Sequence, residues 1–377
     1  HLHRWRGQWL GWLRQSWRLS LWVWLITCPL VWYHFHILAP IAIPLNVVIA
    51  VPLMLALISG LLTGVLGWLP PVGWLCGGLC GTALSVIDVL VTSCQHIPLG
   101  HLWLPAPPLW WIAIFYALVA VWLLIVGQRH NTPLLCLLLA WIGLAVAPHA
   151  TGPRGWWGGT RAWPWPAAES NATNRVDELR CTFLDVGHGT SVIIELPGGQ
   201  VWLYDAGHLG AASRSHQEIA GALWQLPTAR IERLWVSHAD SDHYNAIQGL
   251  LARFRVGSIA STSAFWTSPD GRVQALLEAL PSRLARETFE AGAAGQIAGV
   301  TYQVLHPRPG QVAESDDGSS LCLLLEYVGK RILLPGDLEG SGLLDLTNLP
   351  ARPCHIVMAP HHGSLTLDPS DLLSRYR

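Results

Sequence analysis

A stretch of more than a hundred residues almost without charge constrains this chain most. Between Arg18 and Arg129 the only formally charged side chain is Asp88. At about 1.5 Å per residue, the apolar runs within it are long enough to cross a hydrocarbon core of about 30 Å. The mean hydropathy of +0.35 also exceeds what one ordinary soluble domain would show. We therefore expect the first half of the chain to be a polytopic, α-helical transmembrane region.

Proline and glycine divide this apolar half into shorter segments. Turns such as LPPVG and LPAPP separate five expected spans, near residues 20–39, 43–68, 72–98, 109–127 and 133–149. The run LITCPLVWYHFHILAPIAIPLNVVIAVPL contains four prolines, Pro29, Pro40, Pro44 and Pro52. They predict broken helices, which membranes tolerate where the helix is buried in protein or lines a cavity. Asp88 lies either on a polar pathway or at a helix end.

Arginines set the expected orientation. Four of them precede the first span, namely Arg4, Arg6, Arg14 and Arg18. Arg129 follows the fourth span, so the positive-inside rule places both segments in the cytoplasm. Five spans then put the rest of the chain outside, whereas Arg154 and Arg161 favour the opposite arrangement. The net charge of −1 and the single lysine exclude a basic block that would by itself indicate nucleic-acid binding.

The composition changes after residue 150. Residues 153–168, PRGWWGGTRAWPWPAA, have no helical or strand period and are typical of a linker. From about residue 180, short β-rich runs alternate with helices expected near 215–226, 244–254 and 271–289, and Pro-Gly-Gly at 197–199 predicts a hairpin turn. We expect a transmembrane domain over 1–150, a linker over 151–178 and a soluble α/β domain over 179–377.

Metal-competent side chains follow three apolar strands of this second half. After IERLWVS, the motif HADSDH supplies His238, Asp240, Asp242 and His243. Asp337 follows the strand in RILLPGD, and His361 and His362 follow the strand in HIVMAPHHG. A polar surface loop could have the composition of HADSDH alone. Because three strand ends carry such residues, we interpret them as ligands that meet at one edge of a sheet.

At this point a resemblance becomes specific. The motifs LDVGHGTSVIIE, WLYDAG, SHADSDH, LLPGD and APHHGS, in this order, resemble the metallo-β-lactamase-fold domain of the ComEC family of DNA-uptake channels. The run YHFHILAPIAIPLNVVIAVPL is similar to a competence-domain segment of the same family. The resemblance covers nearly all of the chain and implies an αββα sandwich after the membrane region. Compared with that family, we expect this chain to lack three parts: the N-terminal OB-like domain, the first helices and the C-terminal end of the hydrolase domain.

The resemblance implies two divalent metal ions, zinc or manganese. Their ligands would be His238, Asp240, Asp242, His243, Asp337, His361 and His362. The first two belong to one metal position, Asp242 and His243 to the second as the catalytic pair, and Asp337 bridges the ions. One of His361 and His362 closes the second position. The family shares the aspartate at Asp240 where the superfamily usually has histidine, and an oxygen ligand widens the choice of metal toward manganese.

Other positions depart from the family pattern or support the ligands. A third-motif histidine is absent near SDDGSS, where Asp316 or Asp317 is the alternative ligand. Where the family commonly has Gln and Asp, this chain has His188 and Thr190; His188 either supports the site or contacts substrate, or is a surface histidine. We expect Asp205 to orient the metal loop by a hydrogen bond. His306 is expected to belong to a turn.

The implied function is DNA uptake through a membrane channel. The outer domain would hydrolyse phosphodiester bonds of one DNA strand while the other strand is imported, with membrane lipid and other uptake proteins as further partners. Two alternatives remain: a channel whose extramembrane domain guides DNA without cleaving it, and a membrane-tethered hydrolase of a small ester. Clustered carboxylates disfavour the first, because DNA-guiding surfaces use arginines and aromatic side chains. The proline-broken membrane half disfavours the second, because an anchor needs only one span.

Overall fold

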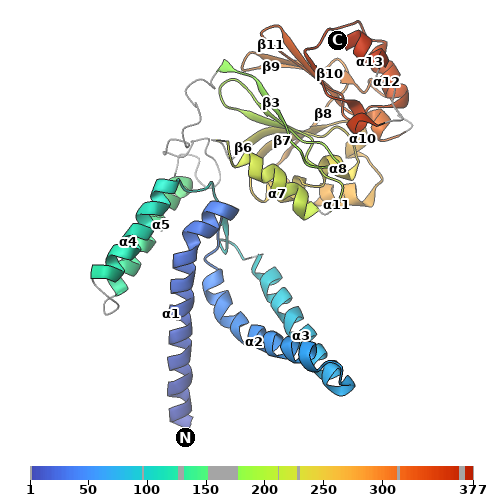
Figure 1. Ribbon diagram of the computed structural model, residues 1–377. Helices are drawn as coiled ribbons and strands as arrows, with labels where there is room; N and C mark the ends of the chain where they lie inside the picture. Colours follow the sequence, from blue (N-terminus) through green and yellow to red (C-terminus); the bar gives the residue numbers. More distant parts are fainter. Residues whose placement is uncertain are drawn as a thin grey trace. The chain divides into compact units, whose positions relative to one another are not determined.

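Two units make up the chain, His1–Thr151 and Gly152–Arg377. The structure, a computed structural model, describes residues 2–95, 97–125, 131–151, 177–210, 212–226, 230–311, 315–364 and 370–376 (Figure 1). Most of the expected linker, with Arg154 and Arg161, lies outside the described residues, as does Arg129.

Helices form the first unit. They are α1 (Leu2–Phe35), α2 (Ala42–Leu66), α3 (Pro70–Gln95), α4 (Leu109–Ile125) and α5 (Asn131–Thr151). Among the described residues, two of them, α2 and α3, are long and apolar enough to cross a membrane. The apolar parts of α4 and α5 are shorter, Leu109–Leu124 and Thr132–Val146. Each expected span therefore coincides with a helix, but a region with five membrane spans is not confirmed.

The long proline-containing run breaks at one place, between α1 and α2. His36 has a left-handed backbone (φ 55°), and β1 (Ile37–Leu38) then pairs antiparallel with β2 (Leu102–Trp103). The Leu104 amide donates to the His36 carbonyl at 2.9 Å, which extends the ribbon by one bond. The chain leaves the helical conformation here because its backbone groups find partners outside the helix.

Two of the four prolines do not break a helix, contrary to the sequence-based expectation. Pro29 lies inside α1 and Pro52 lies inside α2. The Tyr116 hydroxyl of α4 donates to the Ile26 carbonyl at 2.7 Å, in the turn that precedes Pro29. Neighbouring side chains of this kind satisfy carbonyls near a helical proline and make the helix tolerable.

Two mixed sheets form the second unit. The first sheet has the order β3-β4-β5-β6-β7-β8, with strands Arg180–Phe183, Val192–Glu195, Val201–Tyr204, Arg230–Trp235, Arg255–Ser261 and Ala285–Thr288. The second has the order β13-β12-β11-β10-β9, with strands Ile356–Val357, Lys330–Leu334, Cys322–Tyr327, Val300–His306 and Ala294–Ile297. Strands β5 to β8 run parallel, and so do β12 and β13. Their carboxyl ends can therefore share one rim.

Alternate residues of the strands build the core between the sheets. Trp202 and Tyr204 of β5 and Trp235 of β6 are buried against Leu323 and Leu325 of β11. The Tyr204 hydroxyl lies 2.7 Å from the carbonyl of Leu321, which directly precedes β11, and 3.1 Å from the carbonyl of Leu334, the last residue of β12. Because successive residues of a strand face opposite sides, the other faces remain for helices.

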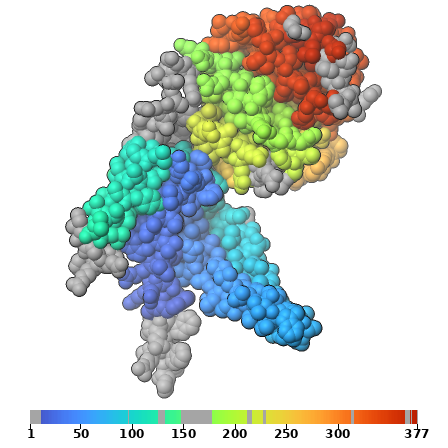
Figure 2. Space-filling model, in the orientation of Figure 1, coloured from blue at the N-terminus to red at the C-terminus, as the bar shows by residue number. Residues whose placement is uncertain are grey.

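Helices cover the outer faces, which gives the αββα order expected from the resemblance (Figure 1). On the second sheet, α12 (Gly340–Thr347) and α13 (Ser370–Tyr376) bury Leu346, Leu372 and Tyr376 against Leu324 and Leu333. On the first sheet lie α7 (Ala212–Leu223) and α11 (Gly271–Ala279). The short helices α8 (Ser241–Tyr244) and α9 (Ile247–Leu251) follow β6, and α10 (Ser263–Trp266) follows β7. In the space-filling view the described residues of this unit pack into one compact body (Figure 2).

The expected helix over 271–289 is wrong in its second half. Helix α11 ends at Ala279, and residues 285–288 form β8, which pairs with β7. Leu280 is extended (φ −65°, ψ 134°) because Pro281 follows it and disfavours the helical conformation. The strands β7, β8 and β9 were not expected from sequence, since their short runs carry glycine or charged residues.

One arginine is enclosed by aromatic rings between the sheets. The Arg233 guanidinium carbon lies between 5.1 and 5.6 Å from four ring centroids, those of Trp202, Trp235, Phe289 and Tyr302. Its Nη2 lies 2.8 Å from the Glu287 carboxylate of β8. The side chain is only 16% exposed, so solvent screens these interactions weakly. Arg233 thus links β5, β6, β8 and β10.

We expect Arg233→Ala to destabilise the second unit by about 2 kcal/mol, because it removes these cation–π contacts and leaves Glu287 unpaired. Hydrogen exchange of the full chain in detergent should then be about 30-fold faster at the β5 and β6 amides. Arg308→Ala removes an ion pair whose arginine is 54% exposed, and should leave exchange unchanged. Equal exchange in both variants would show that the aromatic enclosure contributes no stability.

Candidate metal centre

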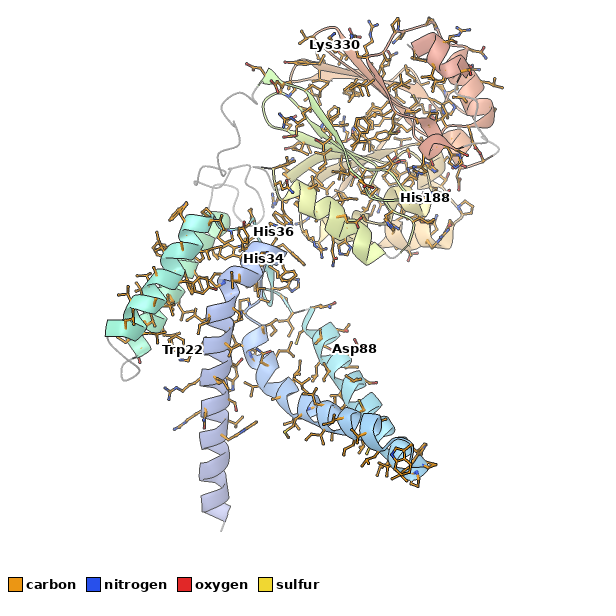
Figure 3. The ribbon with its side chains drawn as sticks, in the orientation of Figure 1. Trp22, His34, His36, Asp88, His188 and Lys330 are labelled. Atoms are coloured by element: carbon orange, nitrogen blue, oxygen red, sulfur yellow. The ribbon has the colours of Figure 1, made fainter. Side chains whose placement is uncertain are left out.

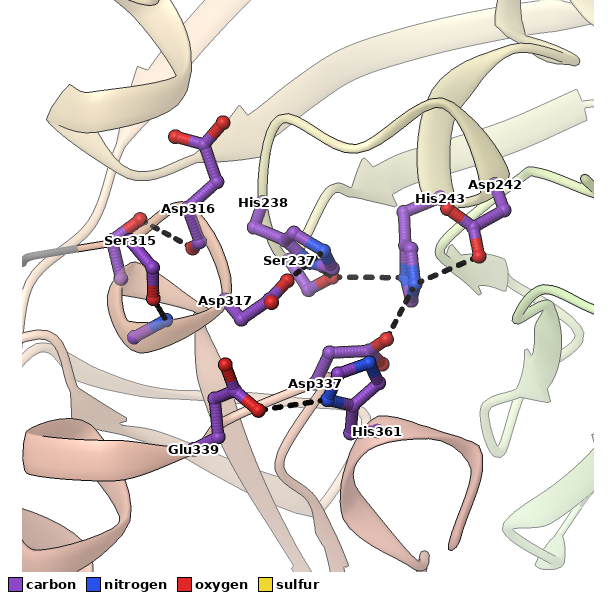
Figure 4. Close-up of polar contacts among 12 residues, drawn as sticks. Ser237, His238, Asp242, His243, Ser315, Asp316, Asp317, Asp337, Glu339 and His361 are labelled. Atoms are coloured by element: carbon purple, nitrogen blue, oxygen red, sulfur yellow. Dashed lines mark hydrogen bonds and ion pairs between the residues drawn. The ribbon is translucent and has the colours of Figure 1, made fainter. Parts of the chain in front are cut away.

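The expected ligands come from loops of both sheets. His238 to His243 follow β6 in the first sheet, and the short helix α8 begins within this loop. Asp337 follows β12, and the 3-10 turn η4 (Pro360–Gly363), which contains His361 and His362, follows β13 in the second sheet. Figure 4 shows the side chains of these loops converging. The centre can therefore form only when the two sheets pack together.

Four side chains surround the second metal position that the sequence predicts. His243 Nε2 lies 3.2 Å and His362 Nε2 lies 3.1 Å from Asp337 Oδ2. Asp242 Oδ2 lies 3.9 Å from His243 Nε2 and 3.4 Å from His362 Nε2. The side chains of His243 and Asp337 are 0% and 5% exposed, and those of His362 and Asp242 are 19% and 12% exposed. Donor atoms at these separations can share one ion.

The first position is richer in oxygen. Ligand atoms of His238, Asp240 and Asp317 lie within 4.8 Å of one another, and those of His238, His243 and Asp337 do likewise. Asp317 Oδ1 lies 3.2 Å from His238 Nε2. Of the two aspartates that the sequence left open, Asp317 thus reaches the cluster, whereas Asp316 belongs to no such group among the described residues. The Asp337 carboxylate is common to both positions.

The two adjacent histidines turn in different directions. Both have left-handed backbones, with φ 48° at His361 and 52° at His362. His362 faces Asp242 and Asp337, as given above, while His361 Nδ1 lies 3.0 Å from Glu339 Oε2. Figure 4 shows the His361–Glu339 pair beside the main cluster. Of the pair, His362 is therefore placed to close the second position.

A buried carboxylate holds the loop that carries these residues. Asp205 Oδ1 accepts the Ser237 amide at 2.7 Å, and Asp205 Oδ2 accepts the Ser237 hydroxyl at 2.8 Å. The same Oδ2 lies 2.9 Å from His243 Nδ1, which leaves Nε2 for the centre. Gly207 allows the loop after β6 to lie close to the segment after β5, since a Cβ at Gly207 would lie 2.1 Å from the Asp242 carbonyl carbon. Asp205 thus orients the metal loop, as expected from sequence.

Two further residues near the site have contacts that sequence reasoning did not give. Thr190 Oγ1 lies 3.4 Å from His362 Nδ1, so it helps to turn Nε2 toward the carboxylates. Only the position of Thr190 in the glycine-containing motif LDVGHGT hinted at such a role. His306 Nδ1 donates to the Ser320 carbonyl at 2.9 Å, and His306 belongs to none of the metal-competent groups among the described residues.

The charges of the cluster are arranged for cations. Burial by itself would lower the pKa of His243, but Asp205 outweighs it and raises that pKa to about 10. Contact with Asp242 and Asp337 raises the pKa of His362 to about 9. Burial raises the pKa of Asp240, and the carboxylates of Asp317 and Asp242 add to the rise. The site therefore favours positive charge. Without metal ions, the protons on His243 and His362 provide part of that charge.

The donor set fits a pair of divalent ions. Among the described residues, His238 Nε2, His243 Nε2 and Asp337 Oδ1 are buried without a well-aligned hydrogen bond, and the two imidazole nitrogens each face a carboxylate oxygen at 3.2 Å. Such atoms are costly unless something satisfies them, and each is directed at the cluster. Four carboxylates, those of Asp240, Asp242, Asp317 and Asp337, would balance the charge of two divalent ions. Imidazole and carboxylate ligands suit zinc and manganese.

Comparisons with known proteins show which families the two parts of the chain match. The family model described as Metallo-beta-lactamase superfamily matches residues 184–374, more than half of the chain, and the one described as Competence protein matches residues 1–150. The chain is 25% identical to ComE operon protein 3 of Bacillus subtilis (strain 168) over 360 residues, which cover 89% of this chain and 42% of that protein.

Further similarities are more limited in extent. The chain is 28% identical to Competence protein ComA of Neisseria gonorrhoeae over 196 residues, covering 50% of this chain and 24% of that protein. It therefore spans less than half the length of either relative. A solved metallo-beta-lactamase of Cronobacter sakazakii is 19% identical, with a TM-score of 0.35, over 47% of this chain and 76% of that one.

Metal binding should release protons. In the metal-free chain the pKa values of His243 and His362 are raised from 6.5 to about 10 and about 9, so both rings are protonated at pH 7.5. A ligand imidazole must be neutral, so we expect metal uptake to expel about two protons at pH 7.5 and progressively fewer as the pH rises through 9 and 10. Calorimetric titration with Zn²⁺ in buffers of different ionisation enthalpy measures this number. Release of no protons at pH 7.5 would contradict the assignment of both rings as ligands.

Asp205→Asn should weaken metal binding about 10- to 100-fold, because the amide no longer fixes the His243 ring. Competition with a chromophoric chelator, using the full chain in detergent, measures the affinity. Asp345→Asn is the matched control, since Asp345 pairs with Arg308 and Gln311 away from the centre. An affinity that Asp205→Asn leaves unchanged would show that this carboxylate does not support the site.

Proposed function

The chain belongs to the metallo-beta-lactamase superfamily and carries a competence-protein domain before that part, and on this premise we propose that it is a metal-dependent DNA hydrolase of a DNA-uptake channel. The second unit would cleave phosphodiester bonds of the strand that is not imported. The chain spans 42% and 24% of the lengths of its two relatives, so an activity of the whole protein is assigned to this chain only as a proposal.

One observation carries the proposal. Imidazoles and carboxylates from four separate loops meet at one rim, and three of their ligand atoms are buried there without a well-aligned hydrogen bond. When bound, a pair of divalent ions supplies Lewis acidity at a phosphate and makes water a nucleophile near neutral pH. A core that served only packing would not bury these groups, because each costs free energy while unsatisfied.

The protein's residues divide the work of such a site. Asp337 holds both positions together, and Asp242 and His243 present their ligand atoms to the second one. Asp205 fixes the His243 ring, and Thr190 contacts the back of the His362 ring. Since the side chains of Asp242 and His362 are 12% and 19% exposed, substrate can approach from their side. Catalysis by preorganised groups requires this kind of support.

We place the first unit in the cell membrane as a multi-pass region. Helices α2 and α3 are long and apolar enough to span it, and lipid would contact their exposed apolar side chains. Asp88 of α3 (Figure 3) stays a candidate for a polar pathway. Arg14 and Arg18 favour a cytoplasmic start of α1, which with five spans puts the second unit outside the cytoplasm. Other proteins of the uptake machinery would be its partners there.

Asp242→Ala should abolish DNA cleavage. We expect the full chain, purified in detergent, to cleave linear DNA with Mn²⁺ or Zn²⁺. The variant should cleave more than about 100-fold more slowly, because removing a metal ligand lowers activity more than removing a group that only supports a ligand. Release of labelled nucleotides measures the rate. Glu326→Ala, which removes an exposed carboxylate paired with Arg331, is the control and should cleave normally.

Other outcomes separate the alternatives. Cleavage that survives Asp242→Ala would contradict the hydrolase. A metal-loaded chain that binds single-stranded DNA without cleaving it would favour the DNA-guiding function. Hydrolysis of a small phosphodiester or lactone, with DNA left intact, would favour the small-ester hydrolase.

A further inference from the structure

An exposed histidine from a separate loop stands beside the second metal position. His188, between β3 and β4, has a side chain that is 61% exposed, and its Nε2 lies 3.8 Å from Asp242 Oδ2. Its ring centroid lies 4.9 Å from that of His362. The ligand atoms of His188, Asp242 and His362 all lie within 4.8 Å of one another. Figure 3 shows His188 at the surface of the second unit, far from Lys330.

The backbone of this loop is fixed against the metal loop. The Thr190 amide donates to the Asp242 carbonyl at 3.3 Å, and the Leu209 amide donates to the His188 carbonyl at 2.5 Å. Gly189 has a φ of 149°, and a Cβ there would lie 2.9 Å from the Asp242 carbonyl oxygen. Only glycine permits so close an approach. The position of His188 is therefore built into the fold, although its side chain is exposed.

The separations suit a shared ion. Two donor atoms that each lie about 2.1 Å from one ion are at most about 4.2 Å apart. The 3.8 Å between His188 Nε2 and Asp242 Oδ2 is within this limit. The exposed ring can also adjust its side-chain torsions at little cost, since it has no close packing on its outer side.

The charge balance favours a neutral ligand at this place. Asp242 and Asp337 already bring two carboxylates to the second position, and Asp240 and Asp317 bring two to the first. Four negative charges match two divalent ions, so a further carboxylate would be repelled. An imidazole adds a strong nitrogen ligand without adding charge.

We propose that His188 is a fifth protein ligand of the second metal position, an inference that rests on the metal centre of the proposed function. The second position then has three imidazoles, those of His188, His243 and His362, with two carboxylates. The first has one imidazole, His238, and three carboxylates. The two positions differ in ligand chemistry, so the second prefers zinc or cobalt and the first accepts manganese.

Metal titrations of the full chain in detergent test this inference. Calorimetry with Co²⁺ should show two binding steps in the wild type. In His188→Ala the affinity of one step should fall about 10- to 100-fold while the other stays unchanged, which also shows that the variant is folded. The visible absorption of the Co²⁺ protein should become stronger, because loss of a ligand lowers the coordination number.

His355→Ala is the matched control. His355 lies just before β13, where its ring contacts the Arg331 amide, and it belongs to none of the metal-competent groups among the described residues. Its two Co²⁺ steps and its spectrum should equal those of the wild type. If His188→Ala also keeps both affinities and the spectrum, His188 is not a ligand, although the metal centre stands. If the wild type binds no Co²⁺, the metal centre itself is refuted.

Discussion

The contact of the buried Asp337 carboxylate with His243 and His362 is the interaction on which the candidate metal centre depends. Asp337 follows a strand of the second sheet, His243 belongs to a loop of the first, and the separations are 3.2 and 3.1 Å. Burial would raise the pKa of Asp337, but these two histidines hold it well below its usual range. A charge buried this deeply is stable only when its partners are in place, so the sheets must pack in one register.

Packing of the sheets supplies that register without help from the site. Tyr204 reaches carbonyls of the opposite sheet, and Arg233 lies among rings from β5, β6 and β10. Apolar burial and these few polar contacts fix where each strand ends. The ligand loops then begin at neighbouring points of the rim, and Asp205 and Gly207 determine how the β6 loop turns. Stability and ligand placement thus use different residues of the same strands.

Much of the architecture could be predicted from patterns that are local in sequence. Each expected span coincides with a helix, and the second half contains β-strands alternating with helices as expected. The failures are local conflicts. Pro29 and Pro52 read as helix breakers but lie inside helices, and near Pro29 a hydroxyl of α4 satisfies a carbonyl of the preceding turn. Residues 285–288 read as helix but form an edge strand beside β7. Pairing partners decide such cases, and a single segment does not contain them.

By itself the sequence determined the division into an apolar and an α/β half and the kinds of ligand at three strand ends, because period, charge and residue type act through neighbours along the chain. Only the tertiary structure decided which partners each of two similar residues meets. His362 faces Asp337, while His361 pairs with Glu339 and shares a metal-competent group with Asp317. Asp317 approaches His238, while Asp316 belongs to no such group among the described residues. Adjacent residues of a loop point in different directions, and their choice follows from backbone torsions and from partners distant in sequence. His188 likewise lies beside Asp242 because backbone hydrogen bonds to residues distant in sequence hold its loop, and these bonds cannot be predicted from a sequence motif.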